Sequence, residues 1–133
     1  MGVPETHYQQ LGGEVRVREL VDRFYDLMSL ETEYSVIRGL HASDLTHARD
    51  KLFWFLSGWL GGPQLYVERF GHPRLRARHL PFSIGEPERD QWMACMVQAM
   101  KEIGVAEDLR RILTASFYKT ADFMRNREAE LPG

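Results

Sequence analysis

The chain contains one cysteine, Cys95, among its 133 residues. It therefore cannot form an internal disulfide or a metal site built from several cysteines. A single cysteine among apolar neighbours is typical of a protein core, and we expect Cys95 to be buried. The sequence also lacks any apolar run close to the roughly 18 residues of a membrane span. Its first ten residues have no basic start followed by an apolar stretch, so we expect a cytoplasmic protein with no membrane partner.

An excess of one charge is absent as well. Seventeen lysines and arginines stand against 19 acidic residues, which gives a net charge of -2. This balance provides no overall attraction to nucleic acid or anionic lipid, so a bulk polyanion binder is disfavoured. Internal repeats, low-complexity segments and long linkers are also missing, and we expect one domain over residues 1–133.

Familiar catalytic motifs are missing too. None of the five histidines lies in an HExxH pattern, and no Gly-x-Ser-x-Gly, phosphate-loop or dinucleotide-binding motif occurs. The sequence therefore gives no support to a zinc site made by protein ligands alone, a serine hydrolase or a nucleotide-binding protein.

The sequence does contain strong helical periodicity. Apolar residues recur at intervals of three and four over residues 14–30, 44–60, 86–103 and 109–124. No segment alternates polar and apolar residues as a half-buried strand would, so the predicted fold class is all-α. Prolines and glycines in residues 61–86 predict only short helices there, and such an irregular segment often carries function.

The irregular segment is also the most basic part of the chain. Residues 69–79 hold four arginines and two histidines, and no acidic residue occurs from Arg69 to Ile84. Its charge of +4 leaves -6 for the rest of the chain. A solvated loop paired with surface carboxylates explains the charge, but not the apolar Leu75, Leu80 and Phe82. Haem, with an apolar ring, two propionates and an iron that one imidazole can hold, fits both features; His79 is then either its ligand or a structural histidine.

At this point the chain resembles a known family, the group II truncated haemoglobins, over nearly its whole length. The matching segments, in chain order, are Tyr8-x-x-Leu11-Gly12-Gly13, Arg23-Phe24-Tyr25, Trp59-Leu60-Gly61-Gly62-Pro63, Gly71-His72-Pro73-Arg74-Leu75-Arg76-x-Arg78-His79, Pro81-Phe82 and Glu88-Arg89-Asp90-x-Trp92. The ordered set is specific, although a single Gly-Gly pair would not be. The resemblance implies a single truncated globin domain: a two-over-two helical sandwich with a shortened first helix around haem b.

The resemblance also implies residue roles. His79 would be the proximal iron ligand, with its other ring nitrogen donating to a backbone carbonyl and the sixth iron position left open. Tyr25 and Trp92 would be distal hydrogen-bond donors to the bound ligand. His41 lies near where some relatives place a second distal tyrosine, and it faces either the ligand or solvent.

The remaining implied residues form the haem pocket. The candidates to pair with the propionates are Lys51, Tyr66, His72 and Arg78. The candidates to wall the pocket are Leu52, Phe55, Phe82, Ile84 and Met96.

The function implied is reversible binding of O2 or another diatomic ligand such as NO or CO, in the class of oxygen-binding and oxygen-transport proteins. Two donors predict slow release, which suits sensing or scavenging better than bulk delivery. Redox turnover of NO or peroxide would be an enzymatic extension and would need a reductase, and the sequence leaves a homodimer open. The alternative is a haem-free helical module that binds nucleic acid or an acidic partner through residues 69–79.

Overall fold

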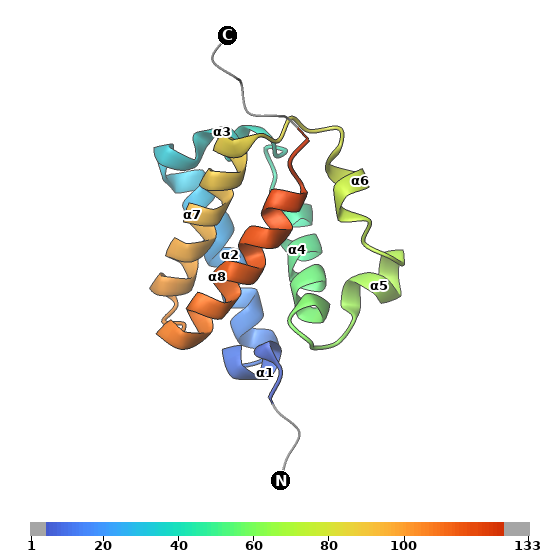
Figure 1. Cartoon of the computed structure of the whole chain (residues 1–133), viewed down its shortest axis with the longest axis vertical. Helices are drawn as coiled ribbons and strands as arrows, with labels where there is room; N and C mark the ends of the chain where they lie inside the picture. The colour runs from blue at the N-terminus through green and yellow to red at the C-terminus, as the bar shows by residue number, and fades with distance from the viewer. Residues whose placement is uncertain (1–4, 127–133) are drawn as a thin grey trace.

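The computed structural model describes residues 5–126, and all its regular elements are helices (Figure 1). Four of them are long: α2 (Glu14–Leu30), α4 (Thr46–Trp59), α7 (Glu86–Glu102) and α8 (Glu107–Phe123). The others are short: α1 (His7–Leu11), the 3-10 turn η1 (Thr32–Tyr34), α3 (Ser35–Gly39), α5 (Leu65–Phe70) and α6 (Leu75–His79). The prediction of an all-α fold with four long helices is confirmed.

The long helices share one hydrophobic core. α2 packs on both α4 and α7, and α7 packs on α8. Figure 1 shows α5 and α6 on one side of this group, and α5 packs against α4. The largest fully buried side chains come from all four long helices and include Leu20, Phe24, Met28, Leu56, Met96, Met100 and Leu113.

Cys95 belongs to this core, as predicted. Its side chain is completely buried and its thiol donates to the Phe24 carbonyl at 3.2 Å. Burial raises the pKa of the Cys95 thiol to about 12, so the group is protonated at neutral pH.

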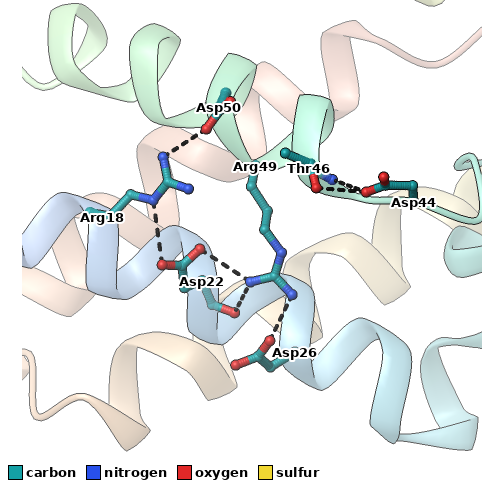
Figure 2. Close-up of polar contacts among 7 residues, drawn as sticks. All are labelled: Arg18, Asp22, Asp26, Asp44, Thr46, Arg49 and Asp50. Atoms are coloured by element: carbon teal, nitrogen blue, oxygen red, sulfur yellow. Dashed lines mark hydrogen bonds and ion pairs between the residues drawn. The ribbon is translucent and has the colours of Figure 1, made fainter.

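The ends of the first two long helices have clear local causes. α2 follows two glycines with positive φ, Gly12 at 121° and Gly13 at 81°, a conformation that side chains with a Cβ rarely adopt. The second long helix was predicted from Asp44 but begins at Thr46. Asp44 instead accepts hydrogen bonds from the Thr46 backbone amide at 2.8 Å and hydroxyl at 2.6 Å (Figure 2), so its carboxylate precedes the helix rather than capping it.

The later helices follow the predicted signals. Pro87 lies in the first turn of α7, where its missing amide hydrogen is not needed, and the Gly85 amide donates to Glu88 at 3.2 Å. Gly104, with φ 81°, separates α7 from α8. Within residues 5–126, no helix is long and apolar enough to cross a bilayer.

Candidate functional site

His79 is the last residue of α6, a helix with no buried side chain. The imidazole is half-buried, and its Nδ1 lies 2.6 Å from the Leu75 carbonyl oxygen. A carbonyl can only accept, so Nδ1 carries the proton and Nε2 keeps a free lone pair. This is the tautomer in which a histidine ligates a metal through Nε2.

Tyr25, on α2, lies next to His41, which follows α3. Their ring centroids are 5.7 Å apart and the rings are nearly perpendicular. Tyr25 is 5% exposed, and within residues 5–126 its hydroxyl has no hydrogen-bond partner. Every side-chain nitrogen or oxygen atom in the same range that is shielded from solvent has a hydrogen-bond partner. The Tyr25 hydroxyl must therefore reach an accessible space, and burial raises its pKa, so it remains a donor.

His41 is held in the same way as His79. Its Nδ1 lies 2.8 Å from the Ile37 carbonyl, four residues earlier, which leaves Nε2 free. Burial lowers the pKa of His41, and the charges of Arg38 and His79 lower it further.

Trp92, on α7, joins this group through Phe24. The Phe24 ring lies 5.0 Å from the Tyr25 ring and 5.3 Å from Trp92. Trp92 also packs edge-on against Phe117 at 5.6 Å and is half-buried. A chain of ring contacts thus runs from His41 through Tyr25 and Phe24 to Trp92.

An ion-pair network joins α4 to α2 (Figure 2). Arg49 donates to the Asp22 and Asp26 carboxylates at 3.1 and 2.7 Å, and its guanidinium lies 5.9 Å from the Tyr25 ring. Arg18 binds Asp22 from the other side and also reaches α4. Sequence reasoning missed this network, because the two acidic partners of Arg49 lie 23 and 27 positions away from it in the chain.

Of the four propionate candidates, Tyr66 is buried and the other three are exposed, although Arg78 lies against Tyr66. Tyr66 is buried on α5 with the Arg78 guanidinium 5.7 Å from its ring. Arg78 donates through Nε to the Pro73 carbonyl at 2.9 Å, and Lys51 is exposed on α4. His72 is also exposed, and its Nδ1 accepts the Arg74 amide at 3.0 Å in the turn before α6.

The candidate wall residues differ in exposure. Leu52, Phe55 and Ile84 are half-buried, while Phe82 is 42% exposed with its ring 6.5 Å from that of His79. Met96 is completely enclosed in the core. An open hollow of about 510 Å³ lies between α4, the turn before α6 and α8, and its lining includes Phe55, Trp59, His72, Leu75 and Phe123.

These features fit a haem better than a bare metal ion. Within the part of the chain that the structure describes, no three His, Cys, Asp or Glu side chains gather to hold an ion. A haem needs only one imidazole with a free nitrogen, apolar cover and a few cations near its edge. His79 supplies the imidazole. The half-buried side chains of α4 and residues 82–84 supply the apolar cover, and Arg78 and Lys51 supply the cations.

Sequence reasoning also missed two residues that hold the His79 segment. Asn126, after α8, donates to backbone carbonyls on both sides of the turn that follows His79. Arg76, which was noted only as part of the basic segment, donates to carbonyls at the end of α8. Periodicity and motif spacing give no signal for such contacts, because they join positions more than 40 residues apart.

Comparison with known proteins identifies the family of the chain. The family model for bacterial-like globins matches residues 6–126. The group 2 truncated haemoglobin YjbI of Bacillus subtilis is 40% identical over 124 residues, which cover 92% of this chain and 91% of that protein.

Solved structures agree as well. The group II 2-on-2 haemoglobin of Agrobacterium tumefaciens has a TM-score of 0.91 at 40% identity, covering 96% of this chain and 98% of that one. A truncated haemoglobin from Bacillus subtilis described as oxygen-avid has a TM-score of 0.82 at 39% identity, covering 92% of this chain and 100% of that one.

The fold and site thus define a haem-binding globin. More closely, the chain belongs to the bacterial-like globins, and among them to the group II truncated haemoglobins. This assignment confirms the two-over-two helical fold and does not favour the haem-free alternative.

Proposed function

We propose that this globin holds haem b through His79 Nε2 and reversibly binds O2 or another diatomic ligand. The observation that carries the proposal is the His79 ring itself. Its Nδ1 is committed to the Leu75 carbonyl at 2.6 Å, and its helix leaves the ring free of the protein core. The bound haem would supply a ferrous iron that takes up the diatomic ligand and shifts negative charge onto O2.

Tyr25, Trp92 and His41 would act on that ligand from the other side. The Tyr25 hydroxyl and the Trp92 indole nitrogen are hydrogen-bond donors, and neither has a partner among the described residues. Neutral His41 has its proton on Nδ1, which is bonded to Ile37, so its Nε2 can only accept in that state. Tyr25 and Trp92 are therefore the proposed donors, and His41 would donate to the ligand only once it is protonated.

The other pocket residues would hold the cofactor's edge and faces. Lys51, Tyr66, His72 and Arg78 would serve the propionates by charge or hydrogen bonding. Leu52, Phe55, Phe82, Ile84 and Met96 would form the apolar walls. Covering the exposed parts of Leu52, Phe55, Phe82 and Ile84 would remove apolar area from water, at about 25 cal/mol per Å², whereas Met96 is already enclosed in the core.

Slow release of O2 follows from the proposed donors. Hydrogen bonds to a negatively charged acceptor are worth about 1.5–3 kcal/mol each, so two of them retain the ligand strongly. The similarity to a Bacillus subtilis protein described as oxygen-avid supports the same conclusion. Sensing or scavenging suits such a protein better than delivery.

An absorption spectrum of the purified protein in its ferric and ferrous-CO forms tests the proposal. We expect a haem spectrum in the wild type and strong loss of pigment in His79→Ala. His47→Ala is the matched control, because His47 is exposed on α4 and outside the site. Wild-type protein that stays colourless with added haemin, or a His79→Ala variant with unchanged uptake and spectrum, contradicts the proposal.

A further inference from the structure

The short helix that carries His79 has little of its own to fix its position. α6 has five residues, none of them buried. A helix of this length is unstable alone, because one turn does not repay the cost of nucleation. Its place must therefore be set by contacts from elsewhere in the chain.

Asn126 supplies the most concentrated set of such contacts. Its Nδ2 donates to the carbonyls of Phe82 at 2.6 Å and His79 at 3.2 Å. Its Oδ1 accepts the Ile84 amide at 2.9 Å, and its own amide donates to the Ile84 carbonyl at 2.9 Å. One residue thus closes the whole turn from His79 to Ile84.

The segment that carries Asn126 is itself anchored. Asp122, at the end of α8, accepts from Arg89 of α7 at 2.8 Å and from Arg125 at 2.7 Å. From the α6 side, Arg76 donates to the carbonyls of Phe123 at 2.9 Å and Arg125 at 2.7 Å. The turn after His79 is therefore connected through Asn126 to the two helices at the centre of the fold.

We propose that Asn126 is a positioning residue for the proximal histidine. It acts through the His79 backbone, since its Nδ2 bonds the His79 carbonyl and leaves the imidazole free. The inference rests on the proposed role of His79 as iron ligand. Loss of the carboxamide would free the backbone of residues 79–84, and the ring on that backbone would then sample more orientations.

Two variants separate the contacts of Asn126. Asn126→Ala removes every side-chain bond. Asn126→Asp keeps an acceptor for the Ile84 amide but places an oxygen against the carbonyls of His79 and Phe82, so it removes only the bonds on the His79 side. Gln98→Ala is the matched control, because this carboxamide on α7 accepts the Tyr34 hydroxyl at 2.5 Å and has no bond to the His79 turn.

Three measurements on the full-length chain test the proposal. Resonance Raman spectroscopy of the deoxygenated ferrous protein reports the iron–imidazole stretching band, which should shift and broaden in both Asn126 variants. Haem transfer to an acceptor apoprotein should become about tenfold faster, as expected for the loss of bonds of this kind. Amide hydrogen exchange of the haem-free chain should accelerate at Phe82 in both variants, and at Ile84 in Asn126→Ala, which alone removes the acceptor of the Ile84 amide. Gln98→Ala should match the wild type in all three.

The outcomes distinguish the two proposals. Wild-type values for both Asn126 variants, or equal changes in Gln98→Ala, would show that Asn126 has no specific positioning role. A wild-type protein without an iron–imidazole band would instead refute the role of His79. The exchange data on the haem-free chain would still decide whether Asn126 holds the turn.

Discussion

Replacing Tyr25 by phenylalanine removes one oxygen atom and little else. The ring contacts with Phe24 and His41 do not involve the hydroxyl, and the hydroxyl has no partner among residues 5–126. The change should therefore have little effect on stability, and the free energy of unfolding should stay within about 0.5 kcal/mol of the wild-type value. The rate of O2 dissociation, in contrast, should rise strongly.

The size of the effect follows from the kind of hydrogen bond. A bond from the hydroxyl to a negatively charged ligand is worth about 1.5–3 kcal/mol, and each 1.36 kcal/mol is a factor of ten. If the bond is lost before release, O2 should dissociate about ten- to a hundredfold faster from Tyr25→Phe. Carbon monoxide acquires little charge, so its release should change far less.

Tyr34→Phe is the matched control with the opposite pattern. Tyr34 is also buried, at 3% exposure, but its hydroxyl donates to Gln98 at 2.5 Å. Its loss should lower the free energy of unfolding by about 0.5–1.5 kcal/mol and leave O2 release unchanged. Stopped-flow replacement of O2 by CO and urea unfolding measure the two quantities.

A Tyr25→Phe variant that releases O2 at the wild-type rate would refute the assignment of Tyr25 as a distal donor. A large loss of stability in that variant would also contradict the reasoning, because it would mean that the hydroxyl is bonded within the protein. Equal acceleration in Tyr34→Phe would show that general loosening, rather than a lost donor, controls release.

Two further substitutions test the packing and the electrostatics of the fold. A Cβ at Gly62 would lie 2.5 Å from the Tyr8 ring, so Gly62→Ala should cost about 1–3 kcal/mol in urea unfolding. Gly58→Ala meets only the movable end of a glutamine side chain and should cost less or gain stability. Burial lowers the pKa of His41 below 6.5, so the unfolded chain takes up this proton first. The free energy of unfolding should therefore fall as the pH drops below about 6.5, and it should fall less steeply in His41→Gln.

Much of the fold was predictable because its signals are local. The helix over residues 14–30 was predicted with the ends that the structure has, since apolar spacing and the preceding Gly12-Gly13 pair both act within a few residues. The cap of the second long helix was predicted at Asp44, one residue before the observed cap position, Leu45. Asp44 has the chemistry of a cap, but it bonds Thr46 across a shorter turn, and residue type alone does not distinguish the two.

The candidate site was less predictable, because contacts between distant residues assemble it. The sequence resemblance pointed to His79, Tyr25 and Trp92, whose roles stay predictions until they are measured. It gave no indication of Asn126, the only asparagine in the chain. A side chain that bonds carbonyls 44 and 47 positions away belongs to no periodic pattern, so only a three-dimensional structure reveals it.

The exposed apolar side chains near α6 suit a division of roles between Asn126 and a cofactor. The four long helices bury a core among themselves, whereas Phe70, Leu80 and Phe82, which flank α6, remain 44%, 57% and 42% exposed. Hydrogen bonds from Asn126 can fix the backbone of this segment, but they cannot remove its apolar side chains from water. A bound haem can cover such side chains, and binding to the folded state alone stabilises that state. The polypeptide therefore places the proximal segment, and burial against the cofactor would supply the hydrophobic contacts that α6 lacks.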